Sequence, residues 1–171
     1  MILWKKQIPI YFGEFVERAQ TVGVDDDSIM SAFEAMRSGD YDRMASYFDT
    51  SSPPNGAYFW SGDGVKEQAA VIAQANGGTI MEQTPGGQVF DGWKGLDTMY
   101  TEWGTGSALD RKPIWKALSY KYASEVTGNV TYVHPSNYVG GVWKNVEKPE
   151  LIRRMRTGFV TSISEVYTDG E

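Results

Sequence analysis

The sequence predicts an α/β fold, in the broad sense that includes α+β proteins, with an N-terminal helical segment and a small, largely parallel sheet flanked by helices. Up to residue 50 the apolar residues show helical spacing only. Residues 49–56, rich in Ser, Pro, Asn and Gly, then interrupt that spacing. After them, short strand-like runs alternate with helical stripes. Such alternation is typical of parallel sheets, whose ligands bind at the carboxyl ends of the strands.

The first part of the chain is predicted to form two helices. The acidic residues 25–27 suit a helix N-terminus, and apolar residues follow every three or four positions until Gly39, which suits the end. Asp40 can cap a second, short helix. We therefore expect a helical segment at residues 1–50 and a catalytic domain at 51–171, packed as one compact unit overall.

The elements expected after the interruption follow from apolar spacing and from the Gly and Pro residues that punctuate it. They are a strand at 57–60, a helix from Val65 that Gly77 and Gly78 terminate, loops with short helical turns at 84–107, a helix from Pro113 to Gly128, strands at 129–133 and 140–146, a last helix opened by Pro149, and a final strand at 159–167.

Composition excludes several classes of protein. The 171 residues carry a formal net charge of -6, which argues against a large nucleic-acid footprint, and the basic cluster near residues 153–156 is too short to change that. The chain has no cysteine, so a disulfide framework, a Cys-zinc site and a cysteine nucleophile are excluded, as befits a protein of a reducing cytosol. No apolar run reaches the roughly 20 residues of a membrane span, and the first six residues do not have the order of a signal peptide.

The single histidine and the short glycine clusters do not indicate a familiar site. Without a Cys or His partner, His134 supports neither a zinc site nor a Ser-His-Asp triad, and we interpret it as the end of a strand before Pro135. The glycines near residues 62–64 and 85–87 are too few for a dinucleotide fingerprint or a P-loop.

Two tryptophan segments are candidates for ligand binding. Trp60, Ser61 and Gly62 lie at the end of a predicted strand, before a helix, where an indole can stack on a flat ring and a hydroxyl near a helix N-terminus can meet a phosphate. Trp115 and Ser119 are four residues apart and therefore share one helix face. Each segment also has a structural interpretation, since a buried Trp beside a turn or inside a helix is common.

Three acidic residues, Glu82, Asp91 and Glu147, are candidate catalytic groups. A carboxylate beside a ribose can stabilise an oxocarbenium-like transition state, and it can also hold the sugar hydroxyls. Ordinary surface charges remain the alternative, and no local pattern decides between the two.

Taken in order, these segments resemble the ADP-ribosyl cyclase/NAD glycohydrolase family, and within it the bacterial domains found at the carboxyl ends of polymorphic toxins. Residues 58–62, Tyr-Phe-Trp-Ser-Gly, resemble the first Trp-Ser motif, and residues 76–82, Asn-Gly-Gly-Thr-Ile-Met-Glu, resemble a bacterial Gly-Gly-Thr-Thr-Leu-Glu pattern. Residues 113–119 are similar to the second Trp helix, and residues 142–149 to the late segment that supplies the catalytic Glu. The resemblance covers about Ala57 to Val166.

This resemblance implies an NAD(P) glycohydrolase or ADP-ribosyl cyclase that cleaves the nicotinamide–ribose bond. Trp60 and Trp115 would enclose the nicotinamide ring, and Glu147 would bind the ribose diol and stabilise the cation. Glu82 would steer between hydrolysis, cyclisation and base exchange, with Asp91 assisting. The substrate would be NAD or NADP, with no metal and no separate cofactor.

The resemblance also implies a phosphate-binding set and leaves some departures. Ser61 and Ser119 would hold the pyrophosphate, with Gly62 beside them where the animal enzymes carry a phosphate-contacting Arg. Gln83 stands where animal members have an acid. The animal enzymes are rich in disulfides, so this chain must be held by packing alone.

The bacterial likeness implies a toxin. It would be secreted or injected by a bacterium, deplete NAD in the target-cell cytoplasm, and have a cognate immunity protein as partner, without nucleic-acid or membrane partners. Two alternatives stay open: a mono-ADP-ribosyltransferase toxin that modifies a protein, and a non-catalytic module that binds nicotinamide nucleotides.

Overall fold

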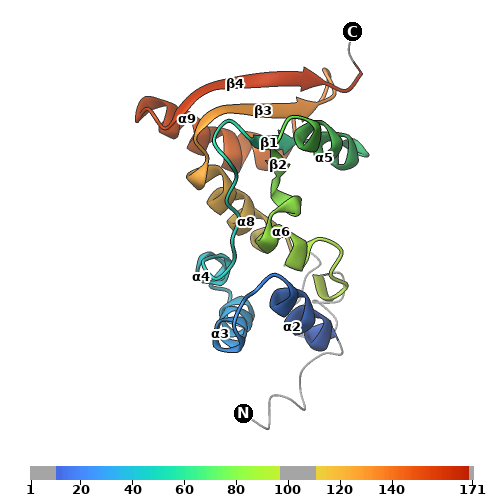
Figure 1. The fold of residues 1–171 in the computed structure, drawn as a ribbon, viewed down its shortest axis with the longest axis vertical. Coiled ribbons are helices and arrows are strands. Elements are labelled where there is room, and N and C mark those ends of the chain that lie inside the picture. Colours follow the sequence, from blue (N-terminus) through green and yellow to red (C-terminus); the bar gives the residue numbers. More distant parts are fainter. Residues whose placement is uncertain (1–10, 97–110, 170–171) are drawn as a thin grey trace. The chain divides into compact units, whose positions relative to one another are not determined.

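The computed structural model describes residues 11–96 and 111–169, which cluster into two units (Figure 1). The first unit comprises residues 1–49 and 85–117, and the second comprises residues 50–84 and 118–171. The helical segment predicted for residues 1–50 therefore shares its unit with a later segment, which the predicted division placed in the catalytic domain. The part of the predicted loop at 97–107 lies outside the described residues.

The first unit is helical where it is described. Its elements are α2 (Tyr11–Thr21), α3 (Asp26–Arg37), α4 (Tyr41–Ala45), α6 (Pro85–Phe90) and the first part of α8 (Arg111–Glu125). Asp25 and Asp40 cap α3 and α4, because their carboxylates accept the backbone N–H groups of Ser28 at 2.9 Å and of Arg43 at 3.2 Å. The cap predicted at Asp40 is confirmed.

Aromatic packing explains why the later segment joins the N-terminal helices. The ring of Phe15 in α2 lies 5.8 Å from that of Phe90 in α6 and 4.9 Å from that of Trp93, centroid to centroid. Arg18 donates from Nε to the carbonyl oxygen of Val89 at 2.9 Å, and its guanidinium also contacts the carbonyl oxygen of Asp91. The side chain of Arg18 thereby satisfies carbonyl groups at the end of α6.

The second unit contains a four-stranded sheet with the order β2-β1-β3-β4. Its strands are β1 (Ala57–Trp60), β2 (Thr79–Ile80), β3 (Gly128–His134) and β4 (Val160–Tyr167). Every neighbouring pair is parallel, and Figure 1 shows β3 and β4 pointing the same way. A small parallel sheet flanked by helices confirms the predicted fold class.

Successive residues of the central strands point to opposite faces of this sheet. On one face, Tyr58 and Val133 pack in a buried cluster with the apolar stripe of α5 (Val65–Ala75). On the other, the ring of Phe59 lies 5.0 Å from that of Tyr122 in α8 and 5.5 Å from that of Trp143. Both faces are therefore covered, as parallel sheets require.

The strand predicted at residues 140–146 is wrong. A short helical turn leads there into a π-helix, η3 (Trp143–Glu147), which continues into α9 (Lys148–Arg156). Trp143 and Glu147, four residues apart, are both buried, which a helix permits by placing them on one face. A short run with apolar residues at alternate positions does not separate strand from helix by itself.

The other expected elements after residue 56 agree with the structure to within a few residues. α8 begins at Arg111, two residues before the Pro113 that was expected to open it, and Pro149 lies in the first turn of α9. In residues 11–96 and 111–169, no helix is both long and apolar enough to span a bilayer.

Candidate active site

The candidate residues Trp60, Glu82 and Glu147 lie at or after the carboxyl ends of three strands of the second unit. β1 ends at Trp60, β2 is followed directly by the short 3-10 helix η1 (Met81–Gln83) that carries Glu82, and β3 ends at His134. Because the strands are parallel, their carboxyl ends lie along one edge of the sheet. The chain that leaves β3 then forms η3, whose last residue is Glu147.

Trp60 and Glu82 are joined directly. The indole Nε1–H of Trp60 donates to Oε2 of Glu82 at 2.6 Å. Glu82 is buried, and the neighbouring side chain of Gln83 accepts the backbone N–H of Ile80 at 3.1 Å, which closes the turn that carries Glu82. A short hydrogen bond to a carboxylate is among the stronger polar contacts in proteins, so it orients both the indole and the acid.

Glu147 is the second buried acid of this site. Burial, followed by repulsion from the charge of Glu82, raises the pKa of Glu147 to about 8, while a hydrogen bond from the hydroxyl of Ser119 in α8 acts in the opposite direction. Near neutral pH this carboxyl group therefore holds a proton in the free protein. A cation placed beside it would favour the carboxylate form.

Tyr122, which lies three residues after Ser119 in α8, links two neighbouring strands of the sheet. Its hydroxyl donates to the carbonyl oxygen of Thr79 at 2.8 Å and accepts the N–H of Tyr58 at 3.1 Å, which links β2 to β1. Burial raises the pKa of this phenol well above its usual range, and the charges of the two acids add to the effect. Tyr122 was not among the candidate residues named from the sequence. Its spacing of three from Ser119 was the available signal.

Ser61 and Gly62 form the turn that follows Trp60. The backbone N–H of Ser61 donates to the carbonyl oxygen of Val133 at 3.1 Å, so the turn is fixed to β3. Gly62 has a φ of +109°, and a Cβ there would lie 3.0 Å from the ring of Pro135. A larger side chain at this position would be strained in this backbone conformation.

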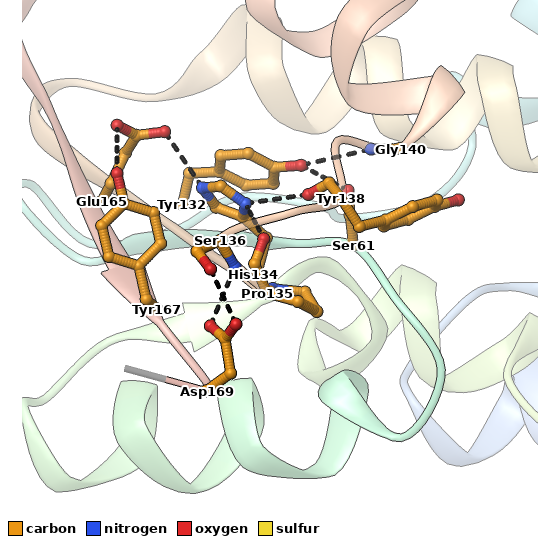
Figure 2. A network of polar contacts seen from close by, with 10 residues as sticks. All are labelled: Ser61, Tyr132, His134, Pro135, Ser136, Tyr138, Gly140, Glu165, Tyr167 and Asp169. Carbon is orange, nitrogen blue, oxygen red and sulfur yellow. Dashed lines mark hydrogen bonds and ion pairs between the residues drawn. The ribbon is translucent and has the colours of Figure 1, made fainter. Parts of the chain in front are cut away.

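A polar network extends from Ser61 along β3 (Figure 2). The hydroxyl of Tyr132 donates to Oγ of Ser61 at 2.7 Å. Two residues later, His134 ends β3 as predicted, with Nδ1 within 2.7 Å of the carbonyl oxygen of Pro135 and Nε2 3.0 Å from the carboxylate of Glu165. The alternation of β3 places Tyr132 and His134 on one face, a signal that the sequence analysis did not use.

The structure thus brings six predicted site residues to one part of the second unit: Trp60, Ser61, Gly62, Glu82, Ser119 and Glu147. Trp60 bonds Glu82, Glu147 interacts with Glu82 and Ser119, and Ser61 follows Trp60. Two others belong to the first unit: Asp91 follows α6, and Trp115 is half-buried in α8. Their places in this site stay predictions. In the described part of the chain, no group of three or more His, Cys, Asp or Glu residues is arranged to hold a metal ion.

Comparisons with known proteins bear on the fold. No family model matches this sequence, and no curated protein matches it. Solved structures do match. The fold is that of the ADP-ribosyl cyclases.

Three of these structures cover 94% of this chain. Aplysia cyclase, complexed with the substrate NGD and the product cGDPR, is 17% identical with a TM-score of 0.65 over 76% of its own length. An ADP ribosyl cyclase complexed with N1-cIDPR is 16% identical, with a TM-score of 0.68 over 76% of its length. Porcine CD38, complexed with a covalent intermediate, ribo-F-ribose-5'-phosphate, is 17% identical with a TM-score of 0.61 over 97% of its length. At these identities the likeness shows a shared fold.

Proposed function

We propose that this protein is an NAD(P) glycohydrolase or ADP-ribosyl cyclase that cleaves the bond between nicotinamide and ribose. The observation that carries the proposal is the pair of buried acids, Glu82 and Glu147, at the carboxyl edge of the parallel sheet. The indole of Trp60 is bonded to the first acid, and the hydroxyl of Ser119 to the second. The fold shared with Aplysia cyclase, whose complex holds NGD, supports the same substrate class.

The chemistry suits such a pair. When the bond between the ribose C1' and the pyridinium nitrogen breaks, its electron pair stays on nitrogen and neutral nicotinamide leaves. Positive charge then develops on the ribosyl carbon, where the carboxylate of Glu147 stabilises it. Water adds to that carbon and loses a proton, which yields ADP-ribose. Attack by a nitrogen of the adenine instead yields the cyclic product, and we assign the choice between them to Glu82.

The raised pKa of Glu147 fits this sequence of events. The substrate carries a positive pyridinium, so its binding beside Glu147 favours release of the carboxyl proton. The negative charge then stands next to the sugar before the bond breaks. The indole of Trp60, held by Glu82, offers a flat surface against which the pyridinium can stack.

The deciding experiment incubates the protein with NAD and measures free nicotinamide, ADP-ribose and cyclic ADP-ribose by chromatography. We expect Glu147→Gln to lower kcat by about a thousandfold while dinucleotide binding persists. The matched control is Glu150→Gln: Glu150 is also buried and lies three residues later, but it is paired with Arg153 at 2.6 Å, and its loss should leave turnover near the wild-type rate.

The outcomes separate the hypotheses. No nicotinamide release at high protein concentration would refute the enzymatic proposal, and a fully active Glu147→Gln variant would refute the assignment of the catalytic carboxylate. Tight binding without release would identify a nicotinamide-nucleotide-binding module. Transfer of the ribosyl label to a protein acceptor would identify a mono-ADP-ribosyltransferase.

We further propose that the protein acts as a bacterial toxin in the cytoplasm of a target cell, with a cognate immunity protein. The sequence likeness to bacterial toxin domains supports this role, and a chain without cysteine suits a reducing compartment. Expression in a bacterial cytosol should lower NAD and arrest growth, whereas Glu147→Gln should do neither. Growth that continues with NAD untouched would contradict the toxin role.

A further inference from the structure

Tyr132 is a deeply buried polar side chain near the site. It is only 1% exposed, and its ring lies between two others on the same face of the sheet. The ring of Trp143 is 3.9 Å away at an interplanar angle of 12°, and that of His134 is 4.1 Å away at 15°. This stack fixes the plane of the phenol and therefore the direction in which its hydroxyl points.

The hydroxyl of Tyr132 takes part in a directed chain of hydrogen bonds. The backbone N–H of Gly140 can only donate, and it donates to the Tyr132 oxygen at 3.3 Å. The Tyr132 hydroxyl in turn donates to Oγ of Ser61 at 2.7 Å. The N–H of Gly140 and the O–H of Tyr132 therefore each have an acceptor, and the series of hydrogen bonds ends at Ser61.

Ser61 is thereby left with a hydrogen to give. Its oxygen accepts from Tyr132, and no acceptor for its own O–H group lies among the described residues. Ser61 is only 6% exposed, so leaving that hydrogen unpaired costs free energy. A buried hydroxyl in this state is a donor for the oxygen of a ligand, and it immediately follows Trp60 at the carboxyl end of β1.

The backbone of Gly140 also lies close to the Ser61 hydroxyl. A Cβ on Gly140 would lie 2.4 Å from Oγ of Ser61, closer than any real side-chain contact allows. The segment that leads from β3 to Glu147 thus passes directly against the Ser61 hydroxyl. Tyr132 contacts both Ser61 and the π-helix η3. Its hydroxyl bonds Ser61, and its ring stacks on Trp143, the first residue of the helix that ends at Glu147.

We propose that Tyr132 is a positioning residue that orients the Ser61 hydroxyl as a donor to a phosphate oxygen of the dinucleotide. This inference rests on the proposed function, because it assigns the phosphates of the same substrate to Ser61. Tyr132 touches no reacting atom. It acts through Ser61, while its ring keeps the Glu147 helix in register through Trp143.

The test uses Tyr132→Phe, which keeps the stacked ring and removes only the hydroxyl. We expect the affinity for ADP-ribose, measured by calorimetry on the full chain, to fall about tenfold. For NAD, KM should rise by about the same factor while kcat changes less than about twofold. Nicotinamide riboside, which lacks phosphate, should be cleaved with unchanged kcat/KM. Tyr138→Phe is the matched control, since Tyr138 lies in the same segment with an exposed side chain, and its affinity for ADP-ribose should equal that of the wild type.

A double-variant cycle separates positioning from general stability. If Tyr132 acts through Ser61, then Ser61→Ala should cause the same loss as Tyr132→Phe, and combining the two should cause no further loss. Additive losses, or an equal loss with nicotinamide riboside, would overturn the inference. If Tyr132→Phe does not fold, Gly140→Ala replaces it, because the added Cβ would displace the Ser61 hydroxyl. Unchanged ADP-ribose affinity in that variant would also overturn the inference. A wild-type protein that binds no ADP-ribose would refute the proposed function itself, and this inference with it.

Discussion

The two units differ in what they bury. Among the described residues, every buried polar or charged side chain belongs to the second unit, and the buried side chains of the first are all apolar. The first unit is centred on rings such as Phe15, Phe48 and Trp93. The second unit buries three carboxyl groups: Glu150, which is paired with Arg153, and the two candidate acids Glu82 and Glu147, which lie near each other and whose desolvation is unfavourable.

This difference shows which unit buries groups that lower the free energy of unfolding. Burial of apolar side chains raises the free energy of unfolding and requires no hydrogen-bond partner, so it suits a segment that only has to fold. Burying two like-charged acids near each other lowers the free energy of unfolding unless a proton is taken up. Such arrangements are typical of sites that bind a ligand, and the second unit is where we propose the active site.

The largest expected change in the free energy of unfolding comes from a substitution in the apolar core of the first unit. Phe15 is fully buried against four other rings, so Phe15→Ala should lower the free energy of unfolding by about 3–5 kcal/mol. The loss should be the same at pH 6 and pH 9, because none of the described residues of this unit buries a titratable group. Guanidinium unfolding followed by tryptophan fluorescence measures both values, and a loss that varies with pH would contradict the comparison.

The next effect has the opposite sign and depends on pH. The pKa of Glu147 is about 8 in the folded protein against 4.5 in an unfolded chain, so between these values the folded state holds a proton that the unfolded state releases. Stability contributed by this group therefore falls as pH rises from about 4.5 to about 8. Glu147→Gln removes that dependence and should raise the free energy of unfolding by a few kcal/mol (on the order of 1.4 per pKa unit) at pH 9, with no gain near pH 4. A gain that is equal at both pH values would show that the acid is not strained by burial.

A third effect concerns the rate. If catalysis needs the carboxylate form of Glu147, kcat/KM for NAD should rise about tenfold per pH unit below pH 8 and level off above it. In Glu82→Gln the midpoint should move to lower pH, because the repulsion that raises the pKa of Glu147 is reduced. Stopped assays from pH 5.5 to 9.5 give both curves, and a flat profile in the wild type would exclude Glu147 as the titrating group.

The smallest effect isolates Ser119. Its hydroxyl lowers the pKa of Glu147 by hydrogen bonding to it, so Ser119→Ala should move the midpoint of the same profile upward, by less than about one pH unit. Ser124→Ala, elsewhere in α8, is the control, because its hydroxyl donates to the carbonyl oxygen of Lys121. A downward shift in Ser119→Ala would contradict the assigned hydrogen bond.

Much of the fold was predictable because its signals are local. Helix caps such as Asp40, the stripe of α5 and the apolar runs of β1 and β3 depend on residues close together in the chain. The same signals placed Trp60 at the end of a strand. The two-residue strand β2 before Glu82 was not predicted, so the proximity of Trp60 and Glu82 came only with the structure.

The π-helix at Trp143–Glu147 was not predictable, because nothing local distinguishes it from a strand. Trp143 is held there by the ring of Tyr132, eleven positions earlier in the chain, and Glu147 by its burial near Glu82 and Ser119. The link that Tyr122 makes likewise depends on backbone groups of β1 and β2, which are distant in sequence.

By itself, the amino-acid sequence determined the fold class, the order of most elements and the identity of the candidate acids, since apolar periodicity and capping act over a few residues. Only the tertiary structure decided that Trp60 bonds Glu82, that Glu147 holds a proton near neutral pH, and that Tyr132 directs Ser61. These properties arise from burial and from contacts between distant segments. Neither exists until the chain has packed.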